Sequence, residues 1–143
     1  MKFRLIIDGD AEEEITARVK SESHLTDEIR RLCEEYGNEI IGYSNNIAAV
    51  LSPADVCCFT VDGGKVVAVT ENGNYAVKTR LYLLDERFGS FVYINQSCLA
   101  NVKKIKRFDV SVGGSLRVTF VGGHTDYVSR RCLKRVKERF GIK

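Results

Sequence analysis

The stretch VCCFTVDGGKVVAVTENGNYAVK, residues 56–78, decides the fold class because it contains two consecutive hairpin patterns. Residues 56–61 and 65–70 are apolar and rich in β-branched side chains, and an Asp-Gly-Gly turn separates them. Asn72-Gly73 is the strongest short-range hairpin signal, and it leads into a further strand over residues 75–78. These patterns predict a β-rich fold built from hairpins.

The sequence on the C-terminal side of this stretch continues the same organisation. Thr79 is placed to cap a short helix, and Ser129 is placed to cap a final helix that ends at Gly141. The apolar faces of the two helices consist of Leu81, Leu84 and Phe88 and of Leu133, Val136 and Phe140. The strands expected between these helices cover residues 91–94, 105–112, 116–121 and 125–128. We therefore expect a mainly β module with one internal helix and one terminal helix.

The N-terminal part of the chain carries a different pattern. Alternating apolar residues predict strands over residues 3–8 and 14–20. Thr26 is placed to cap a helix whose apolar stripe ends at Tyr36, and Gly37 supplies the stop. This part of the chain is therefore expected to be a small α/β segment.

The charge balance divides the chain at Ser52-Pro53. Residues 1–52 hold 6 Lys and Arg against 11 Asp and Glu, whereas residues 53–143 hold 16 against 8. The apolar segment over residues 47–51 ends at the same place, because a proline breaks the pattern. We expect a fold that is mainly β with an α+β lead. The lead is an acidic segment over residues 1–52, able to serve as a dimerisation or regulatory element.

The composition excludes several classes of protein. The sequence of 143 residues has no run of about 20 apolar residues, the length needed to span a bilayer. Its five cysteines are an odd number without Cys-x-x-Cys spacing, which indicates free thiols in a reducing compartment. His24 and His124 stand far apart and form no local metal pattern. We expect a cytoplasmic protein without membrane insertion, metal or cofactor.

The C-terminal third is strongly basic. Residues 101–143 hold 12 Lys and Arg against 3 Asp and Glu. A concentrated positive surface attracts nucleic-acid phosphates and releases their counterions, which favours nucleic-acid binding. The loop Asn95-Gln96-Ser97 adds amide side chains, which have the donor and acceptor atoms to bind an adenine edge.

The stretch from about residue 53 to residue 143 resembles the LytTR DNA-binding domain of bacterial LytR/AgrA-type transcription regulators. The resemblance rests on Ala54-Asp55-Val56, on the run FVYINQSCLAN over residues 91–101, on Ile105, on Gly122-Gly123, on Tyr127-Val128-Ser129-Arg130 and on Leu133 with Val136-Lys137. The lead segment resembles that of compact stand-alone proteins of this family. Residues 1–52 are too few for the phospho-acceptor receiver domain that many family members carry.

The resemblance implies a mechanism and a set of site residues. The family fold is a β-sheet module that inserts loops into successive major grooves of double-stranded DNA, at promoter direct repeats. The implied DNA-binding residues are Lys65, Asn95, Gln96, Ser97, Ser129, Arg130, Arg131 and Lys134. Lys65, Gln96 and Arg131 would reach base edges or the groove, whereas Ser129, Arg130 and Lys134 would hold phosphates. The family usually carries basic residues where this chain has Tyr93 and Gln96, so its central loop is less positively charged.

The sequence therefore favours a sequence-specific transcription regulator, expected to be a homodimer, with a membrane-protein partner left open as the source of its signal. The alternative is a protein-interaction module whose acidic N-terminal segment binds a basic partner, with weak or non-specific DNA binding. An enzyme is not expected, because the sequence shows no nucleophile and base at characteristic spacing and no phosphate-binding glycine loop.

Overall fold

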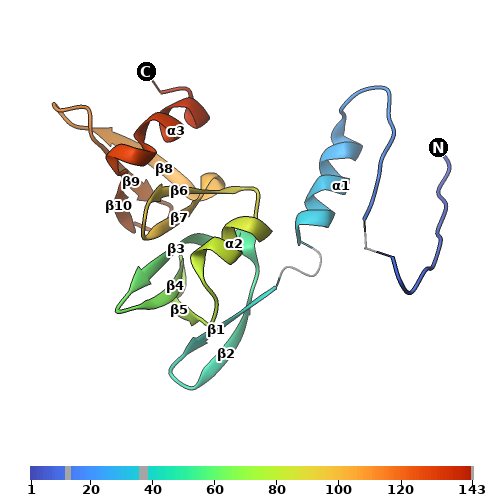
Figure 1. The fold of residues 1–143 in the computed structure, drawn as a ribbon, viewed down its shortest axis with the longest axis horizontal. Coiled ribbons are helices and arrows are strands. Elements are labelled where there is room, and N and C mark those ends of the chain that lie inside the picture. The colour runs from blue at the N-terminus through green and yellow to red at the C-terminus, as the bar shows by residue number, and fades with distance from the viewer. Residues whose placement is uncertain (12–13, 36–38, 143) are drawn as a thin grey trace. The chain divides into compact units, whose positions relative to one another are not determined.

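The computed structural model describes residues 1–11, 14–35 and 39–142 and divides into two units, Met1–Cys33 and Glu34–Lys143. The first unit contains α1 (His24–Glu35), whose last residues extend past the division (Figure 1). The second unit contains every strand in the described part of the chain. No helix in these described residues has the length and apolar character needed to cross a membrane.

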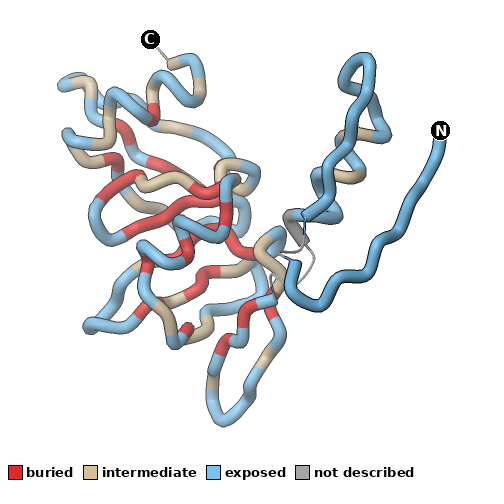
Figure 2. Tube along the Cα trace, turned by 45° about the vertical axis from the view of Figure 1, so that its right-hand side comes forward, coloured by how far each residue is buried: buried red, intermediate tan, exposed pale blue. Residues whose placement is uncertain are grey.

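The strands expected over residues 3–8 and 14–20 are wrong, since both segments are irregular in the structure. Both segments are exposed along their whole length (Figure 2). Phe3 and Ile7 are large apolar residues among them. An alternating pattern describes a strand only where a neighbouring strand satisfies its backbone groups, and the described residues of this unit provide none.

The helix of the first unit begins two residues before its expected cap. Thr26 lies in the first turn of α1, where its hydroxyl donates to the Ser23 carbonyl at 2.8 Å and accepts from the Ser23 N–H at 2.8 Å. This reciprocal pair closes the start of the helix at Ser23. The expected final stripe residue Tyr36 and the expected stop Gly37 lie outside the described residues.

The second unit is built from two antiparallel sheets, and this confirms the expected β-rich fold class. The larger sheet has the strand order β2-β1-β5-β4-β3-β7-β6, and the smaller one has the order β10-β9-β8. The strands are β1 (Ile40–Ser44), β2 (Ile47–Leu51), β3 (Val56–Asp62), β4 (Lys65–Thr70), β5 (Gly73–Val77), β6 (Phe91–Asn95), β7 (Cys98–Asn101), β8 (Ile105–Val110), β9 (Leu116–Phe120) and β10 (Thr125–Tyr127). Short helical turns occupy η1 (Pro53–Asp55) and η2 (Val102–Lys104), and the two longer helices are α2 (Leu81–Arg87) and α3 (Arg130–Phe140).

The compact unit begins earlier than the charge change at Ser52-Pro53 indicates. β1 pairs with β5 through Gly42↔Val77 and Tyr43↔Ala76, and β2 pairs with β1 along its whole length. This hairpin therefore continues the larger sheet, and the boundary is corrected to Cys33/Glu34. The change in charge marks where the surface of the module becomes basic. The boundary of the compact unit depends instead on strand pairing between residues far apart in sequence.

Gly42 shows how tightly the hairpin is packed. A Cβ at this position would lie 2.6 Å from Tyr75 Cβ and 2.7 Å from Leu51 Cδ1. We expect Gly42→Ala to lower the free energy of unfolding by about 1–3 kcal/mol through overpacking. Gly89→Ala is the control, because a Cβ there has no neighbour within 4 Å. Urea unfolding of both variants checks the prediction, and equal stabilities would show that the hairpin is not packed on the sheet.

Two hydrophobic cores stabilise the unit. The first lies under α2, where Phe59, Phe88 and Phe91 form a ring cluster with centroid separations of 6.3, 5.3 and 5.7 Å. The second joins the smaller sheet to α3 and includes Phe120 and Val136, both fully buried.

The two helices of the module begin differently. Ser129 caps α3 as expected, with its hydroxyl accepting from the Cys132 N–H at 3.3 Å, and Gly141 ends the helix at φ 68°. Thr79 does not cap α2 as expected. The N-cap position of this helix is held by Arg80, whose side chain makes no capping hydrogen bond. Phe88 and Leu84 nevertheless hold α2 on the sheet through burial.

Candidate nucleic-acid interface

Three connections of the module meet at one end of its strands. They are the β3–β4 turn, the β6–β7 turn and the segment that leads from β10 into α3. The Val61 N–H donates to the Ser97 carbonyl at 3.0 Å and so joins the end of β3 to the β6–β7 turn. The Ser129 N–H then donates to the Ile94 carbonyl at 2.8 Å and joins the start of α3 to the end of β6. Figure 1 shows the two turns and the start of α3 along the same side of the module.

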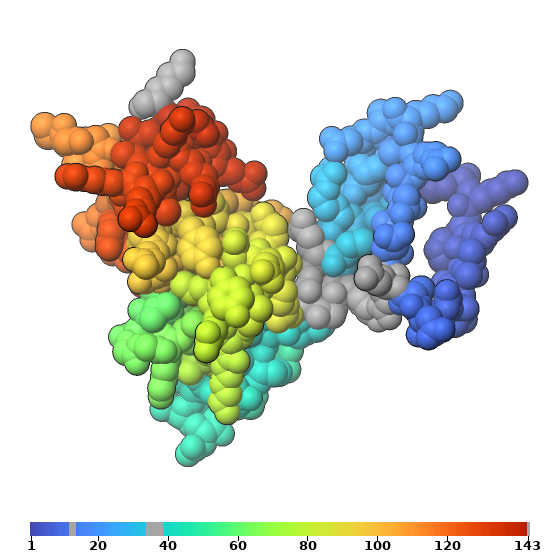
Figure 3. Space-filling view, in the orientation of Figure 1, coloured from blue at the N-terminus to red at the C-terminus, as the bar shows by residue number. Residues whose placement is uncertain are grey.

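Most of the expected DNA-binding residues are exposed on these connections. Lys65 lies at the start of β4, immediately after the first turn. The exposed members of the set are Lys65, Gln96, Ser97, Arg130, Arg131 and Lys134, and Ser129 is half-buried. The structure therefore gathers side chains from three separate segments of the sequence on one surface. Figure 3 shows the red surface of α3 adjoining the yellow surface of the β6 region.

Asn95 is the exception, because its side chain is buried and only 4% exposed. Its amide N–H groups donate to Asp126 Oδ1 at 3.1 Å and to the Tyr127 carbonyl at 2.8 Å. Its amide oxygen accepts from the Ser97 N–H at 2.9 Å. The side chain that the sequence places among the DNA contacts is thus bonded inside the protein.

A basic groove runs along one flank of α3. Its volume is about 540 Å³, and three cations line it, Arg130, Lys134 and Lys137, against one acid, Glu138; Leu133, Gly141 and Ile142 complete the lining. The spacing of the three cations, four and three residues apart, places them on one face of the helix. This face can hold a chain of phosphates, and the uncapped N–H groups of the first helical turn add a positive end.

The other basic cluster of the C-terminal third is partly neutralised. Lys104 forms an ion pair with Glu71 at 3.6 Å, and Arg107 forms one with Asp109 at 3.5 Å. The first of these pairs was not evident in the sequence, because Glu71 belongs to the β4–β5 turn, far from Lys104 along the chain. The positive surface is therefore concentrated on α3 more strongly than the charge count over residues 101–143 indicates.

Cys58, Cys98 and His124 form a cluster of titratable side chains next to Asp126. The hydrogen bond with Cys98 is the main cause that lowers the pKa of the Cys58 thiol to about 6, and the same bond raises the pKa of Cys98. The pKa of His124 is raised by its hydrogen bond with Cys58, and its ring lies 5.8 Å from that of Phe120. The cluster joins β3 and β7 to the turn before β10, so it supports the segment that leads into α3.

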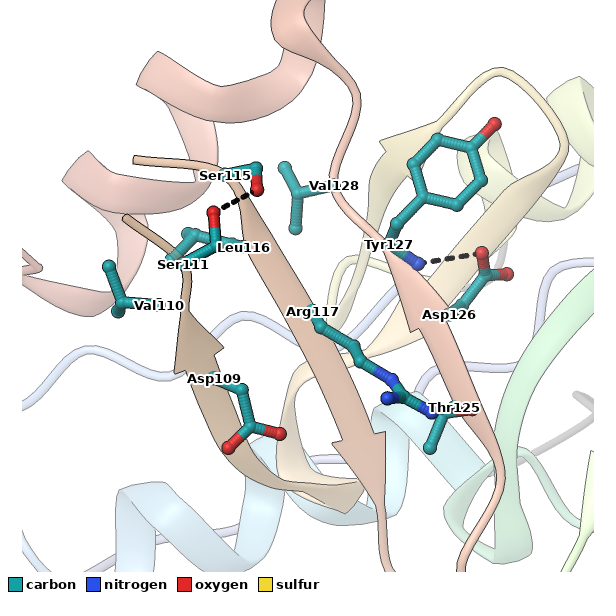
Figure 4. A pocket seen from close by; sticks show the side chains of 10 residues that line it. All are labelled: Asp109, Val110, Ser111, Ser115, Leu116, Arg117, Thr125, Asp126, Tyr127 and Val128. Atoms are coloured by element: carbon teal, nitrogen blue, oxygen red, sulfur yellow. Dashed lines mark hydrogen bonds between the residues drawn. The ribbon is translucent and has the colours of Figure 1, made fainter. Parts of the chain in front are cut away.

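A shallow pocket of about 700 Å³ lies over β9, between β8 and β10 (Figure 4). Arg117 occupies its centre and donates to the Thr125 hydroxyl at 3.3 Å. The figure also shows Asp126 accepting from the Tyr127 N–H at 2.8 Å, and Ser111 bonded to Ser115. The pocket therefore shares its wall with the segment that holds Asn95.

Asp126 is the residue that the sequence analysis missed. It lies 31 residues from Asn95, and nothing in its local sequence indicates a partner there. The aromatic residues of β6 and β8 pack in the hydrophobic cores rather than on the surface of the connections. Phe91 is buried in the first core, and Tyr93 packs against it. Phe108 packs against the second core, with its ring 4.9 Å from that of Phe140.

The comparisons with known proteins agree with this geometry. The sequence model of the LytTr DNA-binding domain family matches residues 48–141. Two relatives from Staphylococcus aureus, strains NCTC 8325 / PS 47 and COL, are 32% identical over 104 residues. The match covers 72% of this chain and 71% of each relative, and both bear the name uncharacterized HTH-type transcriptional regulator.

A solved LytTr DNA-binding domain from Bacillus cereus has a similar fold. The TM-score is 0.67 at 15% sequence identity, and the match covers 72% of this chain and 96% of that domain. The family match, the relatives and the fold all concern the part of the chain that carries the three connections. The chain therefore belongs to the LytTR family of DNA-binding transcription regulators.

Proposed function

We propose that the chain is a sequence-specific regulator that reads double-stranded DNA through the three connections described above. The observation that carries this proposal is their convergence at one end of the strands with exposed Lys65, Gln96 and Arg131 side chains. The helices α2 and α3 are separated in the chain by β6 to β10, so the two are not a consecutive helix–turn–helix pair. The connections between elements, rather than a helix, are therefore proposed to contact the bases.

The side chains divide into two roles. Lys65, Gln96 and Arg131 are proposed to reach base edges in successive major grooves, with Ser97 beside them on the central loop. Ser129, Arg130 and Lys134 are proposed to hold phosphates, which fix the register of the protein on the duplex. The Ser129 hydroxyl accepts within the cap, and its own hydrogen remains available for a phosphate oxygen.

The assembly is proposed from the same reasoning. The module would act in the cytoplasm on promoter direct repeats as a homodimer, without a cofactor. A membrane protein is a candidate source of its signal. Residues 1–33 are proposed as the dimerisation or regulatory element, since they form a separate unit with exposed apolar side chains. Deleting them would tighten DNA binding if this element shields the basic surface.

The alternative function is a protein-interaction module with weak or non-specific DNA binding. Selection of bound duplexes from a random DNA pool by the full chain separates the two functions. Enrichment of one sequence is expected, and failure to enrich any sequence would contradict specific regulation. The salt dependence of binding then reports the number of phosphates, at a slope of about −0.9 per contact.

Gln96→Ala tests direct base reading. We expect a loss of about 1–3 kcal/mol of discrimination at one base pair, because a bidentate amide contact to a base edge is worth this amount. Fluorescence anisotropy with the selected duplex and its single-base-pair variants measures the loss. Asn74→Ala is the control, since this exposed amide lies on β5 opposite Val69, at the end of β4 away from Lys65. Equal weakening on every duplex would show that Gln96 does not read a base.

A further inference from the structure

We propose that Asn95 is a positioning residue that couples the central reading loop to the segment entering α3. The inference rests on the proposed function and changes the role of Asn95 from DNA contact to internal link. We call the hydrogen bonds of its side chain to Asp126, Tyr127 and Ser97 the tie. The tie joins residues 95–97 to residues 126–129, which the sequence separates by about thirty positions.

A β-bulge at the end of β6 makes the tie geometrically accessible. The register of β6 with β7 runs through Tyr93↔Leu99 and then Asn95↔Cys98, so Ile94 is the extra residue. A bulge lets two consecutive side chains face the same side of a strand, and Ile94 and Asn95 are both buried. It also frees the Ile94 carbonyl from the ladder, and that carbonyl accepts from the Ser129 N–H at 2.8 Å.

Both hydrogens of the Asn95 amide are used by the protein, and its oxygen accepts one hydrogen bond from it. Both of its N–H groups donate toward the α3 side, to Asp126 and to the Tyr127 carbonyl. Its oxygen accepts on the loop side, from the Ser97 N–H. The two ends of the amide are therefore assigned without ambiguity, because its partners on one side only accept and its partner on the other side donates. No N–H is left for a base edge, and the side chain is buried away from the surface.

Asp126 completes the tie from the other side. The Asp126 Oδ1 atom accepts from Asn95 at 3.1 Å and from the Tyr127 N–H at 2.8 Å. A carboxylate at position 95 would have no hydrogen for Asp126 or for the Tyr127 carbonyl, and two like charges would face each other. An amide at position 126 would keep an oxygen that accepts from Asn95.

The tie sets the spacing between Gln96 and Arg131. Gln96 follows Asn95 directly, and Arg131 lies two residues after Ser129, the residue that caps α3. Base reading requires both side chains at fixed positions in the grooves, whereas phosphate attraction tolerates small displacements. Loss of the tie should therefore reduce specific binding and leave non-specific binding intact.

The test uses the full chain, a duplex selected by the wild-type protein and a scrambled duplex of equal length and composition. Asn95→Asp is expected to weaken binding to the selected duplex at least about tenfold, the equivalent of losing one base contact, and to leave the scrambled duplex unchanged. Asn74→Asp is the matched control, because it makes the same substitution at an exposed amide on β5 outside the tie, and it should bind as the wild type does. The double change Asn95→Asp/Asp126→Asn restores one side-chain bond in reversed direction and should recover part of the loss.

A measurement without DNA tests the tie independently. In ¹H–¹⁵N spectra, Asn95→Asp should shift the amide signals of Tyr127 and Ser129 and speed hydrogen exchange at Ser129. Should this variant not fold, Asn95→Gln carries the same comparison, because its longer side chain displaces the amide. Equal losses on both duplexes, no loss on either, or unshifted Tyr127 and Ser129 signals would overturn the inference. A wild-type protein that prefers no duplex would overturn the proposed function instead, and the spectra would still judge the tie.

Discussion

Phe59→Ala is expected to lower the free energy of unfolding by about 3–5 kcal/mol, the usual cost of removing a buried phenylalanine. Phe59 is fully buried in the first core and contacts the rings of Phe88 and Phe91. The cavity would lie between β3 and α2, where the remaining two rings cannot both move in to fill it. Since domains of this kind have about 5–15 kcal/mol of stability in total, much of the margin would be lost.

Urea unfolding followed by circular dichroism measures this effect. Tyr82→Ala is the control, because Tyr82 lies on α2, which packs over the core that contains Phe59, but is itself 53% exposed. Its replacement should change the free energy by no more than about 0.5 kcal/mol. Comparable losses in the two variants would mean that the three-ring cluster is not a principal stabilising element.

Arg130→Ala/Lys134→Ala is expected to weaken binding to every duplex by roughly 60-fold at about 0.1 M salt. Each phosphate contact adds about 0.9 to the slope of log affinity against log salt, so two lost contacts reduce it by about 1.8. The counterion effect vanishes at about 1 M salt, which is one decade above 0.1 M. A slope reduced by about 1.8 therefore lowers the affinity at 0.1 M by about 1.8 decades, or roughly 60-fold. Both side chains line the basic groove on α3, so their effects belong to one surface.

The control removes the same charge from the same helix. Arg135→Ala/Arg139→Ala changes two exposed cations that do not line the groove. Anisotropy titrations at several salt concentrations should give this variant a slope close to that of the wild type. If the two double variants lose the same slope, net charge rather than the groove determines phosphate binding.

Local signals predicted the β-rich part of the fold well. The turn at Gly63-Gly64 requires left-handed backbone, with φ of 58° and 79°, and the sequence supplies glycine at both positions. The cap at Ser129 and the stop at Gly141 are equally local, and both are confirmed. Such features depend on a few adjacent residues, so a single sequence is sufficient to recognise them.

Features that depend on distant partners were not predictable. The hairpin over residues 40–51 joins the sheet through β5, and the sequence gives no sign of this pairing. Residues 3–8 have a strand pattern, yet nothing in the described part of their unit pairs with them. Asn95 and Asp126 form their bond only because a bulge and a second sheet bring them together.

The strand order of the larger sheet also bears on how the chain reaches its native state. β3, β4 and β5 pair with their immediate neighbours in the chain, whereas the pairings β1·β5 and β3·β7 each close a long loop. Closing a long loop costs chain entropy before any contact compensates for it. We expect the central three strands to form first and to act as the template on which the strands of both flanks assemble. The kinetic barrier to folding would then lie in recruiting β1 and β7. The β3–β4 turn would be ordered early with the central strands, whereas the β6–β7 turn and the start of α3 would become ordered last.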